Sequence, residues 1–462
     1  MPVRCLLLLS CLLPATAAAV VTTQFLLYVD PCQDRLHVLP SCEARGCEVV
    51  LLHSTAAAEA IISNGESSDD ELCERVMVNR VPLPGDEQLW ALSKVPAGAT
   101  LLGVLCGSDG GLADAERLQD VLCPERSNGL NAARRDKFLM NEAVRAAGLA
   151  APEQASPANW EETRAFLSSL ARWPVVMKPR RGQASVLVGL AHDEAHAQRM
   201  DAILRAPDCH ASIDTSECGA GDGNVVVQEF LAGEEWVVDT VSRAGEHKVL
   251  ALWRYDKGAA NGAPFVYFGI DACGVAGEVE QAVLSYARSA LDALGWRWGP
   301  SHLEIKMVPG RAAQGAAAEP VLIEANMGRW NGEEFKLLAT LCNGHDAYEA
   351  TLDAYLNEAA WAALPEAPPS QLQVHGKNVK LVSHVHGVLT DNPAVVHADA
   401  LEALPSLLRF EPDVSEAGEP ITHTIDLATC AGYCLLVHDD NEQIEADYRI
   451  LRGLQPSLFT VT

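Results

Sequence analysis

Two short stretches of the chain alternate acidic or amide side chains with apolar ones, as β-strands do. They are 302–306 (HLEIK) and 321–326 (VLIEAN). Residues two apart on a strand share a face, so Glu304, Glu324 and Asn326 would direct oxygen atoms to one point if the two strands are neighbours. Crowded carboxylates are stable beside a neutralising cation, and hard oxygen ligands suit Mg²⁺. We therefore predict metal ligands here, the alternative being solvated strand residues.

Two clusters of basic residues are the second chemical feature. Residues 134–137 (RRDK) open a predicted helix, and residues 178–182 (KPRRG) follow a predicted strand. The chain as a whole is acidic, with 34 Lys and Arg against 62 Asp and Glu and a net charge of −28. Local positive charge in such a chain is suited to a polyphosphate, with backbone amides near Gly182 assisting. Taken singly, each cluster is more often a solvated surface.

Two further segments have the composition of a small-molecule site. In 225–236 (VVVQEFLAGEEW) an apolar strand leads into a short link whose amides and carbonyls suit an adenine edge, followed by an acid that could accept ribose hydroxyls. Residues 253–257 (WRYDK), with the aromatic positions of 265–268, mix cations and aromatics as a pocket for amino-acid-like substrates does. An ordinary β-turn and a solvated strand end are the respective alternatives. His302 is either a proton carrier or a hydrogen-bonded structural residue.

The elements that must position these residues can be placed from periodicity. Between 24 and 123, short apolar strands (25–29, 48–52 and 100–105) alternate with helical stretches, which predicts a parallel α/β layer. The turn 106–111 (CGSDGG) follows the third strand, where ligands often lie, although a plain turn explains it equally well. Its spacing differs from the dinucleotide pattern GxGxxG.

Beyond this layer the pattern becomes mixed. We expect helices over 131–148 and 278–294, with strands and hairpins dominating from 173 to 255. A Pro-rich linker (364–371) precedes a small α+β module of strands and one helix. In this module, Thr424 and Asp426 offer no chemical constellation, so we expect it to cap the site or to support a homodimer.

Composition limits the class of protein. At 462 residues, with 48% hydrophobic and 21% charged residues, the chain is long enough for two or three cores. It has no apolar run near the roughly 18 residues of a membrane span, and its acidity disfavours nucleic acid. The 14 cysteines lack a repeated spacing, which indicates reduced thiols and a cytoplasmic protein. Residues 1–19 have the order of a leader, so secretion or organellar import is the alternative.

Taken in order, the segments RRDKF, VVMKP, VVVQEFLAGEEW, HLEIK and VLIEANMGRWNG resemble the ATP-grasp superfamily. The resemblance is to the branch of carboxylate–amine ligases that includes bacterial L-amino-acid ligases and carnosine synthase, and it runs from Gln24 to the C-terminus. It implies an ATP-grasp fold of mixed α/β and α+β class. The expected parts are an N-terminal α/β domain (20–127), an ATP-grasp domain (128–370, with its lid at about 170–225) and a C-terminal α+β module (371–462).

The resemblance also implies roles for individual residues. These are ATP phosphate contacts by Lys137 and Lys178, an adenine lining of Gln228, Glu229, Phe230 and Leu231, a ribose contact by Glu235 or Glu234, one or two Mg²⁺ (or Mn²⁺) ions on Glu304, Glu324 and Asn326, and a flexible lid over 180–186 containing Gly182 and Ser185. Many relatives place an arginine two residues after the metal-binding asparagine, whereas here Arg329 is three residues on. We expect Arg329 to steady an acyl phosphate, because a buried cation beside the metal strand needs an anionic partner.

The activity implied is an ATP-dependent ligase that joins a carboxylate, expected to be an amino acid, to an amine. An acyl phosphate is the expected intermediate, and ADP and phosphate are the other products. Two alternatives stay open: a carboxylase or a ligase for a non-amino-acid carboxylate, and a catalytically silent nucleotide-binding regulator. The expected partners are small molecules, with no nucleic acid and no stable membrane insertion.

Overall fold

The computed structural model describes residues 23–31, 35–58, 79–182, 185–206, 224–310 and 318–462. The candidate leader (1–19) lies outside these residues, as do Gln183 and Ala184 of the expected lid loop (180–186) and residues 207–223 of the wider lid region (about 170–225). Within the described part of the chain, no helix combines the length and the apolar character needed to cross a bilayer.

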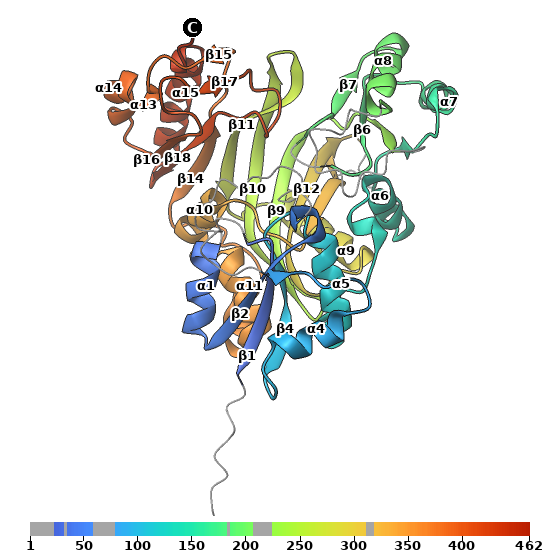
Figure 1. The fold of residues 1–462 in the computed structure, drawn as a ribbon. Helices are drawn as coiled ribbons and strands as arrows, with labels where there is room; N and C mark the ends of the chain where they lie inside the picture. Colours follow the sequence, from blue (N-terminus) through green and yellow to red (C-terminus); the bar gives the residue numbers. More distant parts are fainter. Residues whose placement is uncertain (1–22, 32–34, 59–78, 183–184, 207–223, 311–317) are drawn as a thin grey trace, which may run out of the picture.

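The N-terminal layer is a parallel four-stranded sheet, at the bottom of Figure 1, in the order β3-β2-β1-β4. Alternate residues of the central strand β1 enter two different cores: Leu26 and Tyr28 pack towards α1 and α11, and Leu27 and Val29 pack towards α5. Burial on both faces explains the continuous apolar run and confirms the predicted parallel layer. The elements are β1 (Gln24–Val29), α1 (Arg35–Ala44), β2 (Cys47–His53), β3 (Asn79–Arg80), α4 (Glu87–Lys94), β4 (Thr100–Cys106) and α5 (Leu112–Leu122).

A linking segment follows the N-terminal layer. Two short 3-10 helices, η1 (Pro124–Arg126) and η2 (Ala132–Arg134), precede α6 (Lys137–Ala146). The predicted helix over 131–148 was therefore too long. The α-helix begins at Lys137 because the Asp136 carboxylate caps it, with Oδ1 accepting from the backbone N–H groups of Phe138 and Leu139 at 3.0 Å.

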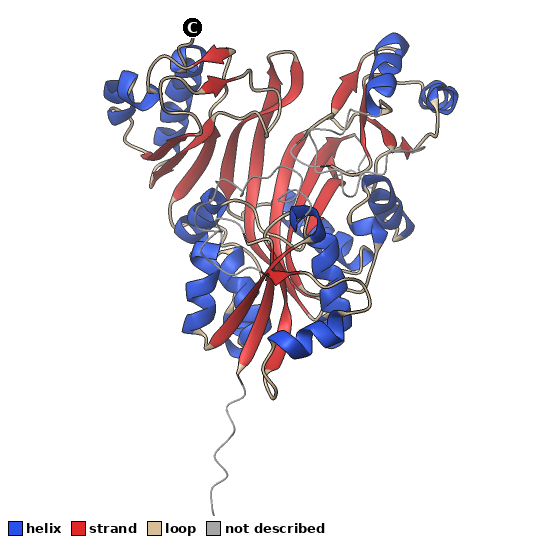
Figure 2. Ribbon diagram, in the orientation of Figure 1, coloured by secondary structure: helices blue, strands red, loops and turns tan. Residues whose placement is uncertain are grey.

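A small antiparallel sheet lies at the upper right of Figure 1 in the order β5-β8-β6-β7, with α7 and α8 packed beside it (Figure 2). Its core includes Val175 and Met177 from β6 and Val225 and Val227 from β8, all buried. The helix α8 interrupts the run of strands predicted from 173 to 255. The elements are β5 (Gln154–Ala155), α7 (Trp160–Leu170), β6 (Val175–Pro179), β7 (Gly189–Ala191), α8 (Glu194–Leu204) and β8 (Val225–Glu229).

The central feature is an eight-stranded antiparallel sheet in the order β13-β12-β9-β10-β11-β14-β18-β16. The two strands predicted to be neighbours are paired, and Glu304 lies opposite Glu324 in their register. Leu303 and Ile305 on the other face are fully buried against α9 and α6. The elements of this part are β9 (Glu234–Arg243), β10 (Glu246–Ala260), β11 (Ala263–Cys273), α9 (Glu278–Ala293), β12 (Gly299–Pro309), β13 (Ala318–Met327), α10 (Glu333–Asn343), α11 (Ala347–Leu356) and α12 (Glu358–Ala363).

The C-terminal segment continues this same sheet, because β14 pairs with β11 and then with β18. The predicted boundary at 370 therefore falls between neighbouring strands of one sheet. A second cluster of buried apolar residues lies under α15. The elements are β14 (His375–Lys380), β15 (Gly387–Val388), α13 (Pro393–Val396), α14 (Ala398–Glu402), β16 (Leu407–Pro412), β17 (Pro420–Ile421), β18 (Gly432–His438) and α15 (Asn441–Leu458).

Candidate active site

A cavity of about 260 Å³ is lined by residues of both the small sheet and the central sheet. Except for Glu234, the alternative to Glu235, the site residues that the resemblance implies line it: Lys137, Lys178, Gly182, Ser185, Gln228, Glu229, Phe230, Leu231, Glu235, Glu304, Glu324, Asn326 and Arg329. These residues come from five strands, one helix and three loops. The structure therefore brings together groups that are up to about 190 positions apart in the sequence.

The three candidate metal ligands share one face of β12 and β13, as the alternation predicted. Their register sets Glu304 opposite Glu324 and His302 opposite Asn326. Burial raises the pKa of Glu304, and the carboxylates of Glu235 and Glu324 raise it further against the opposing effect of Lys257. An oxygen-rich set in which the negative charge of Glu304 is disfavoured fits a hard divalent cation.

Two lysines balance the carboxylate on β13. Lys137 Nζ lies 3.2 Å from Glu324 Oε2 and donates to the Gly182 carbonyl at 2.5 Å. Lys178 is 3% exposed, and burial lowers its pKa to about 8 although Glu324 opposes that shift. Burial works against ionisation of Glu324, but the two ammonium groups outweigh it and lower the pKa of this carboxyl. Two cations beside a partly buried carboxylate are positioned to neutralise phosphate oxygens.

The expected adenine link follows β8. Phe230 and Leu231 line the cavity, and Phe230 stacks with Phe265 at a centroid distance of 6.5 Å. The Glu229 carboxylate accepts from Arg172 at 2.7 Å and from the backbone N–H of Glu153 at 2.7 Å. Its side chain is therefore engaged by groups that do not line the cavity, and its backbone N–H donates to the Glu153 carbonyl at 2.9 Å.

Of the two candidate ribose contacts, only Glu235 lines the cavity. Its carboxylate contacts Lys257 and lies 3.1 Å from Lys306 Nζ, and these two cations outweigh burial and lower its pKa. Glu234 is exposed and lies 3.9 Å from Arg254, which does not line the cavity. The structure thus favours Glu235 of the pair.

Arg329 lines the cavity, but it is not the buried cation that was expected. The side chain is 32% exposed, and its Nε donates to Asp109 Oδ1 at 2.6 Å. Asp109 lies in the turn 106–111 at the end of β4, so this turn contributes to the cavity wall. Arg329 already has an anionic partner, and its position does not require a phosphate to complete it.

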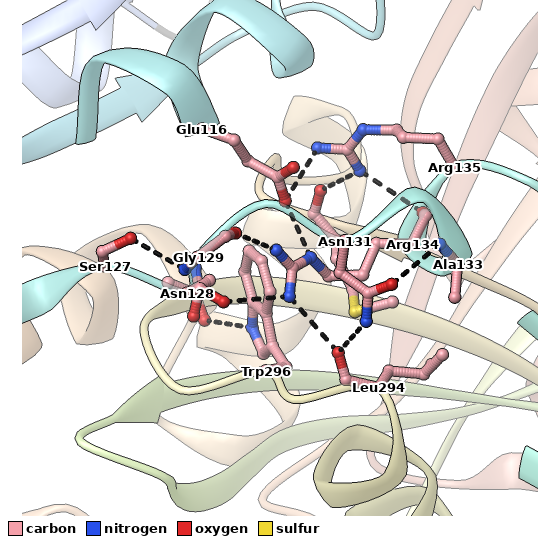
Figure 3. Close-up of polar contacts among 12 residues, drawn as sticks. Glu116, Ser127, Asn128, Gly129, Asn131, Ala133, Arg134, Arg135, Leu294 and Trp296 are labelled. Carbon is pink, nitrogen blue, oxygen red and sulfur yellow. Dashed lines mark hydrogen bonds and ion pairs between the residues drawn. The ribbon is translucent and has the colours of Figure 1, made fainter. Parts of the chain in front are cut away.

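The basic cluster at 134–137 is divided between two functions. Arg134, whose side chain is 1% exposed, donates from Nε to Glu116 at 2.9 Å, and its remaining N–H groups bond backbone carbonyls of Asn128, Gly129 and Leu294 (Figure 3). Its neighbour Arg135 donates to the Met327 carbonyl at 3.0 Å. Neither lines the main cavity, so the interpretation of this whole cluster as a polyphosphate site was wrong.

The second basic cluster is divided in the same way. Arg180 pairs with Asp136 at 2.6 Å and lies over the Phe138 ring, 5.6 Å from its centroid. Lys178 alone of the cluster's basic residues lines the cavity. The carboxylate that caps α6 therefore also orders Arg180, the first residue of the predicted lid loop (180–186).

The aromatic segment 253–257 sends alternate residues into the cavity. Tyr255 and Lys257 line it, with Phe265 and Tyr267 from the paired strand β11. The Lys257 ammonium lies 4.0 Å from the Tyr267 ring centroid. These residues belong to a hairpin of two long strands, so the alternative of a solvated strand end was wrong.

His302 is hydrogen-bonded through both ring nitrogens. Its Nδ1 lies 2.7 Å from Asp239 Oδ1, its Nε2 lies 3.3 Å from the Tyr255 hydroxyl, and Asn331 contacts the same Asp239 oxygen at 2.8 Å. This network fixes the ring on the cavity wall, as expected of a structural histidine.

Several lining residues were not found as site residues from the sequence: Lys306, Asn331, Glu334, Phe335, Lys380 and Leu427. Strand alternation does place Lys306 on the face of Glu304, but nothing in the sequence brings the C-terminal residues to the cavity.

The lining holds six lysines or arginines and six acidic residues. The charges of the cavity lining therefore balance, whereas the whole chain has a net charge of −28. Among the described residues, no group of three or more His, Cys, Asp and Glu side chains is arranged as a metal site.

Comparisons with known proteins found one similar curated sequence and many similar folds. No family model matches the chain. Dapdiamide A synthase from Enterobacter agglomerans is 29% identical over 344 residues, covering 73% of this chain and 74% of that protein. The structure of an L-amino acid ligase from Bacillus licheniformis superposes with a TM-score of 0.65 at 18% identity, covering 96% of this chain and 99% of the other.

A more distant structural relative was solved with a nucleotide. The biotin carboxylase domain of Hydrogenobacter thermophilus 2-oxoglutarate carboxylase, in complex with MgADP and bicarbonate, has a TM-score of 0.55 at 12% identity. The match covers 90% of this chain and 86% of that one. At this level of identity the likeness concerns the fold.

Proposed function

We propose that this chain, which belongs to the ATP-grasp superfamily and has its fold, is an ATP-dependent ligase that forms an amide bond between a carboxylate and an amine. The observation that carries the proposal is the convergence of Lys137, Lys178, Glu304, Glu324 and Asn326 on one cavity. The similarity to dapdiamide A synthase and to an L-amino acid ligase supports an amino acid as the carboxylate substrate.

ATP would lie between the two sheets. The link Gln228–Leu231 would receive the adenine and Glu235 the ribose, while Lys137 and Lys178 would contact the phosphates. Phosphoryl transfer chiefly requires positioning and charge neutralisation, because negative charge spreads over the oxygens of the transferring group. The two ammonium groups meet that need in a chain that elsewhere repels phosphates.

The donor set of Glu304, Glu324 and Asn326 fits Mg²⁺, with Mn²⁺ as a substitute. The fit rests on the partly buried, facing carboxylates and on the pKa of Glu304, which is raised first by burial and then by the neighbouring carboxylates. A cation held there would neutralise charge on the phosphates of the bound nucleotide.

Activation of the substrate carboxylate removes an electrostatic obstacle. An amine cannot readily attack a carboxylate, because the attack would add a second negative charge. Transfer of the γ-phosphoryl group to the carboxylate oxygen releases ADP and gives an acyl phosphate. The amine lone pair then attacks the acyl carbon, the bond to the phosphate oxygen breaks, and the amine loses a proton. Arg329 lines the cavity and would face the anionic intermediate.

The direct test incubates the protein with ATP, Mg²⁺ and pairs of amino acids, then measures phosphate release and product mass. An amide product formed with equimolar ADP and phosphate supports the ligase. Phosphate release that requires bicarbonate, or a non-amino-acid carboxylate, would instead identify another reaction of the superfamily. Nucleotide binding without turnover on any panel would identify a silent nucleotide-binding protein.

A further inference from the structure

An ion pair between a buried lysine and a partly buried glutamate on the cavity wall has no role in the proposed binding of ATP. Lys380, the last residue of β14, donates from Nζ to Glu334 Oε1 at 3.2 Å, and both residues line the cavity. Their side chains are 8% and 16% exposed. The pair is therefore removed from bulk water but faces the space in which reactants would bind.

Lys380 has fewer partners than the other buried lysines of the central sheet. Lys377 contacts two carboxylates, and Lys248 donates to two backbone carbonyl groups. Among the described residues, Glu334 is the single hydrogen-bond acceptor of Lys380. An ammonium group has three N–H donors, and a buried donor without an acceptor is costly. Lys380 thus retains donors for an anionic group.

The Glu334 carboxylate is held in place by the start of α10. It occupies the first helical turn, where negative charge is favoured, and follows the N-cap residue Gly332. A Cβ atom at position 332 would lie 2.2 Å from Glu334 Oε2. The glycine therefore leaves room for the carboxylate to fold back towards the helix start, where it meets Lys380.

The sheet order separates Lys380 from the candidate metal ligands. Three strands lie between β14 and β12, which carries Glu304. Four steps at about 4.8 Å give roughly 19 Å between these strands. The cation that does approach Glu304 is Lys257, at 3.7 Å. Lys380 accordingly lies in the part of the cavity remote from the candidate metal ligands, which suits it to the reactant that does not receive the phosphoryl group, the amine.

We propose that Lys380 binds the carboxylate of the amine substrate and that Glu334 positions the lysine for this contact. The inference rests on the proposed ligase function and narrows its acceptor to an amino acid with a free carboxylate. The product would then be a dipeptide-like amide that keeps this carboxylate.

The test compares Lys380→Met with Lys377→Met, a control at an equally buried, ion-paired lysine on the other face of the same strand. The carboxylate donor is the L-amino acid that gives the fastest phosphate release with the unmodified protein. Three nucleophiles are offered to its acyl phosphate: a second L-amino acid, the amide of that amino acid, and hydroxylamine. Hydroxylamine traps the acyl phosphate as a hydroxamate and has no carboxylate to bind.

We expect Lys380→Met to lower kcat/KM for the amino acid by roughly 10- to 100-fold, the range for loss of a charged hydrogen bond. Three quantities should stay within about twofold of their values in the unmodified protein: the rate of hydroxamate formation, the KM for ATP and the rate with the amide. Substitutions away from an interaction commonly cause changes of this size. Glu334→Gln should show the same pattern with a smaller loss. Lys377→Met should change the rates with the three nucleophiles by the same factor.

Two results would overturn the assignment. If Lys380→Met lowers the use of all three nucleophiles equally, the ion pair is structural. If it lowers none, Lys380 does not contact the acceptor. Absence of phosphate release and of hydroxamate with every donor would instead refute the ligase function itself, and this site with it.

Discussion

Replacing Arg134 by methionine separates its structural role from the phosphate contact that its sequence suggests. The side chain is 1% exposed and connects α5, the segment 128–129 and the end of α9 (Figure 3). The substitution leaves the Glu116 carboxylate and three carbonyl groups short of a donor. Breaking a buried ion pair by removing one partner costs about 3–5 kcal/mol. Burial also lowers the pKa of Arg134, which indicates that part of the pairing energy already offsets desolvation.

Urea unfolding followed by tryptophan fluorescence measures this loss, because Trp296 lies 5.8 Å from the Arg134 guanidinium. The matched control is Arg164→Met on α7, whose exposed ion pair with Glu161 should contribute about 0.5 kcal/mol or less. The KM for ATP of folded Arg134→Met should be close to that of the unmodified protein. A large rise in that KM without loss of stability would refute the structural assignment and restore the phosphate contact.

Two further predictions concern the cavity, and a third concerns the stability of the turn at Gly233, which does not line it. Because burial lowers the pKa of Lys178 to about 8, its positive charge is lost as pH rises through 8, so the KM for ATP should increase between pH 8 and 9.5 in the unmodified protein but not in Lys178→Met. Glu324→Gln should lower phosphate release by about 100-fold through weakened charge stabilisation, whereas Glu319→Gln on the same strand, outside the cavity, should retain it. Gly233→Ala would place a Cβ 1.9 Å from the Met307 carbonyl at a φ of +116°, so thermal unfolding should show a loss of about 1–3 kcal/mol; an unchanged melting temperature would contradict this clash.

The parts of the site that could be predicted are those governed by local periodicity. Alternation on a strand determines that Glu304 faces the same way as His302 and Lys306, and the pairing of two such strands then brings Glu304 opposite Glu324. The parallel layer could be predicted for a similar reason, because a strand buried on both faces has a continuous apolar run such as residues 25–29.

The parts that could not be predicted depend on partners distant in the sequence. Arg134 and Lys137 stand three residues apart in one basic cluster, yet the first meets Glu116 and Leu294 and the second meets Glu324. Charge alone does not distinguish a buried structural cation from a ligand-binding one. Lys380 belongs to the cavity because β14 pairs with β11, a contact that no local pattern encodes.

Because β14 pairs with β11, residues 371–462 do not form an independent domain that could be removed without exposing a strand of the central sheet. A protein truncated at 370 would present the backbone N–H and C=O groups of Gly269, Ile270 and Asp271 as an open strand edge. Open edges of this kind recruit other chains and promote aggregation. Exchange of C-terminal segments between relatives would thus have to preserve the strand register, and specificity at this end of the cavity would evolve together with the integrity of the sheet.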